Sequence, residues 1–234
     1  YRLLPLSGGG GFFNTVQKAQ LQGVHSRRRR PDAGKVYVAG LDLAGEAEQN
    51  PEELLNKESL KRDSTVITIG ELDFSLLNHL QPLPLIKIVE HYVWTGCGHS
   101  DLYARMIDIL GNIWQCRRVA VDATGVGQPI ASFLKKSLGG KIIPFNFTRA
   151  SKSQLGFNLL AAVNAGRLKM YMSDDSAEYR EFCFQFEKAK GVYHPNQTVN
   201  FYVDSSEGHD DYLMSAALLV EAAGRYETRS ARGR

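Results

Sequence analysis

Four aspartates stand where the sequence leads us to expect a strand to end or a helix to begin. Asp42 closes the apolar run in VAGLDLAG, and Asp122 closes a second run in VAVDATGVG. Asp210 and Asp211 open the apolar stretch of GHDDYLMSAALL. Strand ends and helix starts meet at one edge of a folded sheet, so we expect these carboxylates to lie close together.

Clustered carboxylates repel one another unless a cation lies between them. Their hard oxygen atoms are ligands that suit Mg²⁺ or Mn²⁺. Two such ions about 4 Å apart can activate a water molecule and stabilise the leaving oxygen in phosphodiester cleavage. The aspartates therefore predict a metal-dependent nuclease with two ions in its active site.

Each aspartate also has a simpler explanation when it is taken alone. Asp42 can end a strand in a turn, and Asp122 can form an Asx turn. Asp210 and Asp211 can be plain N-caps, the commonest use of Asp at a helix start. The three positions taken together favour one metal site. Within the last pair we assign Asp211 as the main ligand and Asp210 as the cap.

The hydrophobic pattern that must position these carboxylates changes along the chain. Three β-prone runs without intervening helices predict an antiparallel meander, and later alternation of strands and helices predicts parallel pairing. The fold class is therefore α/β, a mixed sheet flanked by helices with an extra β-hairpin. The expected strands are 36–43, 64–70, 85–94, 118–121 and 141–145, the hairpin is 192–203, and the helices are 14–21, 101–114, 127–137, 151–165, 178–189 and 210–223.

Composition divides the 234 residues into three parts. Residues 1–34 are Gly-rich and then Arg-rich, which is typical of a linker. Residues 35–224 are expected to form one domain, and residues 225–234 a basic tail. Residues 46–62 are Glu-rich with few apolar side chains, and we expect an exposed insertion there. No apolar run approaches the ~20 residues of a membrane span, so no membrane partner is expected.

Basic side chains gather at the two ends of the sequence. Residues 1–34 and 225–234 together hold ten Lys or Arg against two acids. Four of them are consecutive: Arg27, Arg28, Arg29 and Arg30. Such a run predicts contacts to DNA phosphates, although a basic run is more often a solvated linker.

The order of elements and acids resembles the RNase H-like nuclease fold, and more narrowly the nuclease domain of the large terminase subunit of tailed phages and prophages. Five motifs carry the resemblance, in order: GLDLAG, RDSTVITIG, VDATGVGQP, FTRASKSQLGFNLLAAVNAGRLKM and GHDDYLMSAALL. The resemblance implies an endonuclease that cuts concatemeric double-stranded phage DNA during genome packaging, with two Mg²⁺ or Mn²⁺ ions as cofactors.

The resemblance also implies a role for each matching position. Asp42 and Asp122 would be metal ligands, together with one or both of Asp210 and Asp211. Asp63, which opens the second strand in RDSTVITIG, would be a supporting acid near the metal ions.

Basic and imidazole groups flank the implied site. Lys152 matches a basic position near the scissile phosphate, and Arg149 would add a DNA contact. His209 would orient a water molecule or cap the last helix. The implied partners are double-stranded DNA, the ATPase domain of the same subunit, the small terminase subunit and the portal, in the host cytoplasm. There are two departures from the family pattern: the insertion 46–62 is longer than the usual connection, and no Walker A sequence occurs.

Other activities use related folds. Actin-like ATPases and sugar kinases place an Asp on the first strand and a DxTG-like turn later, which residues 42–45 and 122–125 satisfy loosely. That architecture needs two such domains, each of roughly 100–200 residues, and it does not call for acids at the last helix. A resolvase or transposase nuclease is the nearest alternative enzyme.

Overall fold

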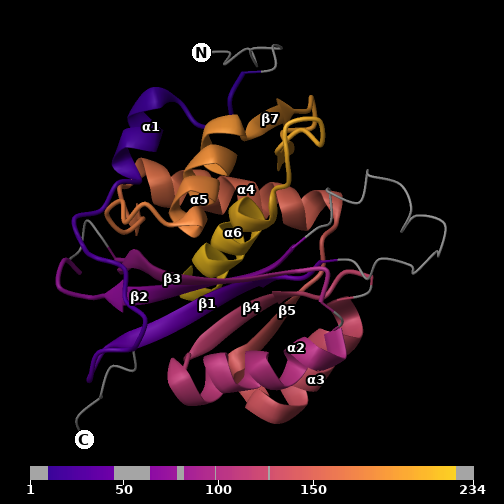
Figure 1. Ribbon diagram of the computed structural model, residues 1–234. Coiled ribbons are helices and arrows are strands. Elements are labelled where there is room, and N and C mark those ends of the chain that lie inside the picture. Colours follow the sequence, from indigo (N-terminus) through magenta and orange to yellow (C-terminus); the bar gives the residue numbers. More distant parts are fainter. Residues whose placement is uncertain (1–9, 45–63, 78–81, 98, 126, 225–234) are drawn as a thin grey trace, which may run out of the picture.

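The fold comes from a computed structural model, which describes residues 10–44, 64–77, 82–97, 99–125 and 127–224 (Figure 1). The Glu-rich stretch 46–62, the predicted supporting acid Asp63 and the basic tail 225–234 lie outside the described residues.

A six-stranded mixed sheet lies at the centre, in the order β5-β4-β1-β2-β3-β6. The first three strands pair antiparallel as predicted, and β4 pairs parallel to β1. β5 adds a further parallel strand at one edge, where Pro144 is tolerated. The short edge strand β6 was not predicted. The strands are β1 (Val36–Asp42), β2 (Ser64–Asp73), β3 (Leu85–Thr95), β4 (Arg118–Asp122), β5 (Ile142–Phe145) and β6 (Leu168–Lys169).

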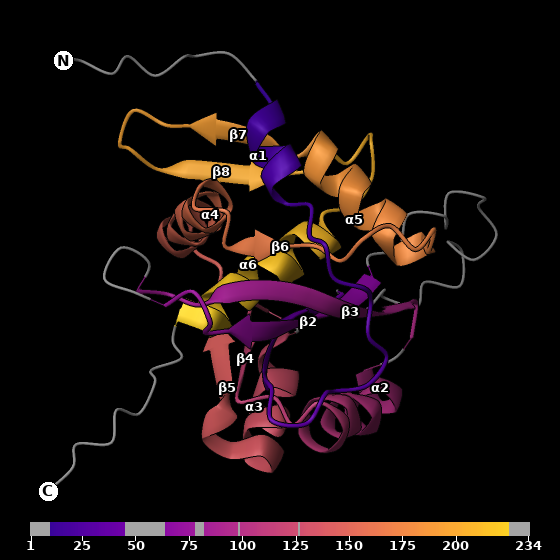
Figure 2. The same ribbon diagram turned by 90° about the vertical axis from the view of Figure 1, so that its left-hand side faces the viewer.

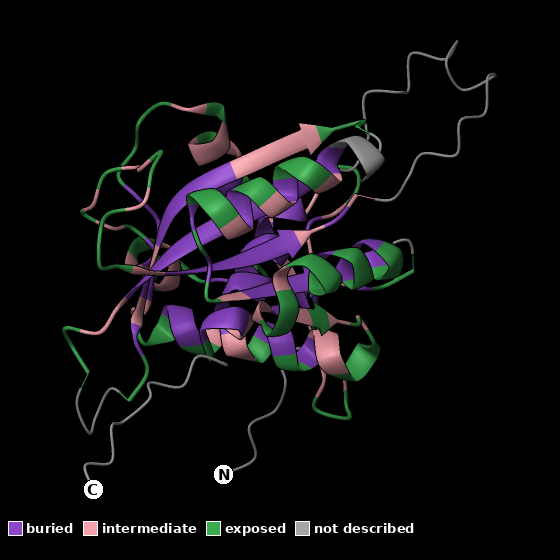
Figure 3. Ribbon diagram, turned by 90° about the horizontal axis from the view of Figure 1, so that it is seen from below, coloured by how far each residue is buried: buried purple, intermediate pink, exposed green. Residues whose placement is uncertain are grey.

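Helices cover both faces of the sheet (Figures 1 and 2). α2, η2 and α3 lie on one face, and their outer surfaces are exposed while the strands behind them are buried (Figure 3). α6 lies on the other face, with α4, α5 and a separate hairpin of β7 and β8 beyond it. The bounds are α1 (Thr15–Gln20), α2 (His99–Ile107), η2 (Asp108–Ile113), α3 (Gly127–Leu138), η3 (Gly139–Lys141), α4 (Arg149–Asn164), α5 (Ala177–Lys188), β7 (Lys190–Tyr193), β8 (Val199–Tyr202) and α6 (Asp211–Gly224).

The fold is thus the predicted mixed sheet flanked by helices, with a separate hairpin, and the predicted helices are present. One differs in kind, because the expected helix 101–114 continues from α2 into the π-helix η2. The Trp114 N–H donates to the Ile109 carbonyl, five residues back, at 2.9 Å. This wider turn places Leu110 and Trp114 in the apolar cluster below the sheet. No helix in the described part of the chain is long and apolar enough to cross a membrane.

The prediction of a linker is wrong for residues 10–34, which are folded onto the domain. Phe12 and Phe13 are 3% and 2% exposed. Phe12 stacks on Phe201 of β8 with ring centroids 5.0 Å apart, and Phe13 stacks on Phe186 of α5 at 5.1 Å. The Gly- and Arg-rich composition of this segment gave no sign that these two side chains are buried.

α6 is the central helix, and every residue from Asp211 to Val220 is buried. A helix that is apolar all round is expected where protein surrounds it on all sides. Gly40 of β1 permits the close approach of α6. A Cβ atom there would lie 2.0 Å from the Ser215 carbonyl oxygen and 2.3 Å from the Leu219 nitrogen. The missing side chain therefore lets the helix backbone rest directly on the strand backbone.

Candidate active site

Two of the predicted aspartates lie side by side at one edge of the sheet. β1 and β4 are adjacent and parallel, with Leu41 opposite Val121. Asp42 and Asp122 are the last residues of these strands. Parallel pairing therefore brings together two carboxylates that are far apart in the sequence.

Both side chains point to the face that α6 covers. Successive residues of a strand point to opposite faces, and Leu41 and Val121 belong to the apolar cluster on the α2–α3 side. Asp42 and Asp122 therefore point away from that cluster, toward the start of α6.

α6 contributes the other two predicted acids. Asp210 and Asp211 stand at its N-terminus, and Asp211 is only 8% exposed. The backbone N–H of Ser64, at the start of β2, donates to Asp211 Oδ2 at 3.0 Å. The contact of α6 with Gly40 sets how far this helix end lies from the strand ends.

One open pocket of about 240 Å³ joins these groups. All four predicted acids line it, together with Lys152 of α4, the basic side chain predicted to lie near the scissile phosphate. The complete lining is Asp42, Leu43, Asp122, Phe147, Lys152, Asp210, Asp211 and Met214. Acids outnumber bases in this lining, so the pocket is strongly negative and would attract a cation.

Asp122 is held by the turn that follows β4. The N–H of Thr124 donates to Asp122 Oδ1 at 2.8 Å, and the Thr124 hydroxyl accepts from the Phe147 N–H at 2.8 Å. Burial raises the pKa of the Asp122 carboxyl above its ordinary value, and the hydrogen bonds from Thr124 oppose this effect only in part. A raised pKa means that the charged form costs free energy here, and a bound cation would offset that cost.

The basic side chains near the pocket come from α4. The Lys152 ammonium lies over the Phe201 ring, 5.6 Å from its centroid. The hydroxyl of Thr148 caps this helix by accepting from the Ser151 N–H at 3.1 Å. Arg149, in the first turn, is exposed, and His209 is half-buried just before α6.

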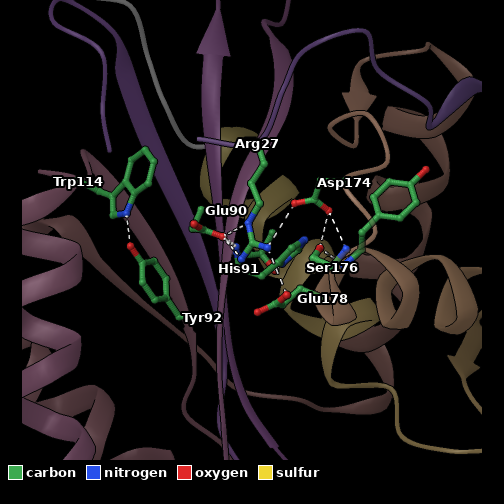
Figure 4. Close-up of polar contacts among 10 residues, drawn as sticks. Arg27, Glu90, His91, Tyr92, Trp114, Asp174, Ser176 and Glu178 are labelled. Carbon is green, nitrogen blue, oxygen red and sulfur yellow. Dashed lines mark hydrogen bonds and ion pairs between the residues drawn. The ribbon is translucent and has the colours of Figure 1, made fainter. Parts of the chain in front are cut away.

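The four consecutive arginines 27–30, which were predicted to bind DNA, divide into two pairs, and Arg29 and Arg30 are the exposed pair. Arg27 donates to Glu90 of β3 at 2.6 Å and to Glu178 of α5 at 3.2 Å (Figure 4). Arg28 forms an ion pair with the buried Glu71 of β2. Arg27 and Arg28 therefore tie the N-terminal segment to the sheet, and we withdraw them as DNA contacts.

His91, next to Glu90, is buried beneath α6. Its Nδ1 lies 3.1 Å from the hydroxyl of Thr68, which contacts the Ser215 hydroxyl of α6 at 2.7 Å. Burial lowers the pKa of His91 to about 3, so its imidazole is neutral at physiological pH. We assign it to the packing of α6, outside the pocket.

Sequence reasoning missed two residues that hold the site in place. Thr124 joins the turns after β4 and β5, and Gln185 of α5 accepts from two backbone N–H groups of α6. Thr124 lies in the quoted motif VDATGVGQP, so its proximity to Asp122 was available as a signal. Gln185 had no signal, because its contact joins two helices.

The pocket suits a hard divalent cation such as Mg²⁺, because its acidic side chains are all aspartates and offer carboxylate oxygens as ligands. Within the described residues, no three His, Cys, Asp or Glu side chains are grouped closely enough to hold an ion as they stand. Two of the carboxylates, those of Asp122 and Asp211, accept hydrogen bonds from backbone N–H groups.

Comparisons by sequence identify no relative: no protein-family model matches the chain, and no curated protein matches it. Comparison of the fold gives clear matches. The large terminase nuclease from thermophilic phage G20c, solved with bound magnesium, superposes with a TM-score of 0.63 at 20% identity, over 92% of this chain and 98% of that one. Crystals of the same nuclease also hold cobalt or zinc.

Two further structures agree with that match. The large terminase nuclease domain of Thermus phage P74-26 gives a TM-score of 0.61 at 18% identity, covering 93% of this chain and 98% of that one. The large terminase of bacteriophage HK97 gives 0.60 at 14% identity, covering 92% of this chain and 44% of that one. The chain therefore has the fold of large terminase nuclease domains.

Proposed function

We propose that this chain is a divalent-metal-dependent endonuclease that cuts concatemeric double-stranded DNA during phage genome packaging, as the nuclease part of a large terminase. The observation that carries the proposal is the pocket in which Asp42, Asp122, Asp210 and Asp211 meet Lys152. The shared fold with metal-bound large terminase nucleases supports it.

The chain's own residues have distinct tasks in this reaction. Asp42 and Asp122, fixed at the ends of adjacent strands, would hold two Mg²⁺ or Mn²⁺ ions together with Asp210 and Asp211. Such ions supply a water molecule activated as the nucleophile and stabilise the leaving oxygen of the phosphodiester. The positively charged Lys152 ammonium, which also lines the pocket, would neutralise charge on the scissile phosphate.

Exposed basic residues provide contacts to the DNA backbone in this proposal. Arg149 begins α4 beside the pocket, and Arg29 and Arg30 are exposed on the N-terminal segment. Arginine contacts to phosphate are independent of sequence and weaken steeply with salt. We therefore expect cleavage of duplex DNA with little sequence preference.

The proposed setting is that of a packaging motor in the host cytoplasm. The HK97 protein that shares the fold is longer, since the match covers 44% of its chain. We propose that an ATPase domain of the same subunit, the small terminase subunit and the portal are the partners of this nuclease.

The test is plasmid cleavage with Mg²⁺ or Mn²⁺ and, in parallel, with EDTA. Asp42→Asn should abolish cleavage because it removes charge from the metal site at constant side-chain size. Asp108→Asn is the matched control, because Asp108 is exposed on η2 and accepts a hydrogen bond from Asn112 that an amide oxygen can also accept. Cleavage that persists in EDTA, or that survives in Asp42→Asn, would exclude the proposed mechanism.

A further inference from the structure

The edge of the sheet opposite the pocket is basic. The neighbouring strands β1, β4 and β5 are parallel, so all three end at the pocket edge and begin at the opposite edge. Lysine or arginine residues stand where β4 and β5 begin, and two more lysines lie in the last turn of α3, just before η3 and β5. We call this group the basic edge, and its members are Arg117, Arg118, Lys135, Lys136 and Lys141.

Four members of the basic edge have no acidic partner in the described part of the chain. Arg117, Lys135 and Lys136 are exposed, and Lys141 is half-buried. The ion pairs among the described residues involve none of these four. The fifth member, Arg118, donates to a backbone carbonyl of η3 at 2.6 Å, which ties η3 to β4. Cations that lie together on a surface create a positive potential that attracts a polyanion.

The beginning of β1, next to β4, is electrically balanced instead. Lys35 comes directly before this strand, and its ammonium lies 3.2 Å from a carboxylate oxygen of the buried Glu71. Arg28 pairs with the same carboxylate and with Asp32. Two bases and two acids offset one another here, so the excess positive charge comes from α3, β4 and β5.

The exposed arginines of the N-terminal segment extend this positive surface. Arg29 and Arg30 come shortly before Asp32, whose backbone N–H donates to the Tyr37 hydroxyl at 2.9 Å. The carbonyl of Tyr37, near the start of β1, accepts from the Arg117 N–H at 2.8 Å. The two arginines therefore lie toward the edge where the strands begin, and away from the pocket where the strands end.

The basic edge is open and lies far from the pocket. A Cβ at Gly140 would meet nothing within 4 Å, so the backbone between Lys136 and Lys141 is open to a large ligand. α3 starts beside Asp122 and has 12 residues, so its two ends are about 18 Å apart at a rise of about 1.5 Å per residue. Phosphates bound at the basic edge are therefore too far away to reach the aspartates of the pocket.

The two edges of the sheet thus have opposite charge. Carboxylates line the pocket and repel phosphate when no cation is bound, whereas the basic edge attracts phosphate. We propose that the basic edge, with Arg29 and Arg30, is a second binding surface for the phosphate backbone of duplex DNA, which holds DNA away from the pocket and needs no metal ion. The choice of DNA among polyanions rests on the proposed function, whereas the position of the surface does not.

The first experiment measures the binding of a short fluorescent duplex in EDTA, by anisotropy, over a series of salt concentrations. The test variant combines Arg117→Gln, Lys135→Gln and Lys136→Gln, three exposed positions outside the pocket. Each lost phosphate contact lowers the slope of log affinity against log salt by about 0.9. We therefore expect the slope to fall by about 2–3 and the affinity at low salt to fall at least about tenfold.

A second triple variant is the matched control, because it removes the same charge elsewhere. It combines Arg180→Gln, Lys188→Gln and Lys190→Gln, in α5 and β7, where the two lysines already pair with acids. This control should bind the duplex within about twofold of the wild type. Asp42→Asn should not weaken binding either, because the pocket takes no part in it. Melting temperatures within about 2 °C of the wild type would show that all variants are folded.

The second experiment locates the DNA on the wild-type protein by acetylating its lysines in EDTA and measuring each site by mass spectrometry. Bound duplex should slow the acetylation of Lys135, Lys136 and Lys141 at least about threefold, since a phosphate contact shields the ammonium. Lys152 in the pocket and Lys188 on α5 should react at the same rate with and without DNA.

The outcomes separate this surface from the proposed function. Unchanged DNA affinity in the first triple variant would overturn the proposal in favour of an acidic protein surface as the partner. Equal losses in both triple variants, or DNA protection of Lys152 but not of Lys136, would overturn it as well. A wild type that binds duplex through the basic edge in EDTA, yet never cuts it with Mg²⁺ or Mn²⁺, would refute the proposed function and leave this surface standing.

Discussion

Replacing Gly40 by Ala tests whether the contact between α6 and β1 assembles the pocket. The added Cβ would lie 2.0 Å from the Ser215 carbonyl oxygen and 2.3 Å from the Leu219 nitrogen, whereas ordinary contacts begin at 3.4 Å. Both neighbours are backbone atoms, so no side chain can rotate out of the way. One of the two backbones must therefore move by more than an ångström.

The expected cost follows from that displacement. Overpacking a core costs about 1–3 kcal/mol, and we expect about 3 kcal/mol because backbone must shift. For a domain of this size that loss lowers the melting temperature by about 6–12 °C. The shift also moves the N-terminus of α6 away from Asp42, and a misplacement of about 1 Å can reduce a reaction rate roughly 100-fold.

Thermal denaturation in EDTA and plasmid cleavage well below the melting temperature measure the two effects. Gly140→Ala is the matched control, because a Cβ there meets nothing within 4 Å and its φ is not in the left-handed range. It should change stability by less than about 0.5 kcal/mol. A Gly40→Ala protein that melts within about 2 °C of the wild type, or that cleaves DNA at the wild-type rate, would refute this account of the site.

Three further predictions concern buried charge. Burial raises the pKa of the Asp122 carboxyl in the fold, so its charged form lowers the stability of the protein at pH 7. This loss disappears as the pH falls toward the pKa of the same carboxyl in the unfolded chain. Asp122→Asn should therefore melt at a higher temperature than the wild type in EDTA at pH 7, with no gain near pH 4. The pKa of His91 is about 3 in the fold against 6.5 in the unfolded chain, so the free energy of unfolding should fall by about 1.4 kcal/mol per pH unit below pH 6.5. In His91→Phe this contribution to the pH dependence should be missing, which urea denaturation at several pH values measures. Arg27→Met leaves Glu90 buried without its ion pair and should lower the free energy of unfolding, measured by urea denaturation, by about 3–5 kcal/mol. Arg29→Met, at an exposed position, should lower it by less than about 0.5 kcal/mol. Equal losses in the two variants would contradict the assigned role of Arg27.

The placement of the acids at the strand ends was predictable from local pattern. Asp42 and Asp122 each follow a short β-prone run, and the alternation of strands and helices in the second half of the chain favours parallel pairing there. Parallel neighbours end at the same edge, so the two carboxylates had to meet there. The pairing of Leu41 with Val121 confirms this reasoning.

Contacts between distant segments were not predictable from local pattern. Phe12 and Phe13 stand in a Gly-rich stretch, and their burial depends on rings from α5 and β8. The cap of α6 comes from Gln185, a residue whose own helix gives no indication of that role. The π-turn at η2 likewise follows from the packing of Trp114 in the apolar cluster below the sheet. The helical periodicity of the sequence does not encode this packing.

The central place of α6 has a consequence for the order in which the molecule can assemble. Every strand of the sheet precedes α6 in the sequence. During synthesis, β1, β2 and β4 therefore emerge from the ribosome before the helix that covers them, and their apolar face stays open until α6 is complete. Asp42 and Asp122 meet Asp210 and Asp211 only at that stage. A nascent chain that already has its sheet would thus hold two of the four carboxylates, and the proposed active site would remain incomplete until the helix docks.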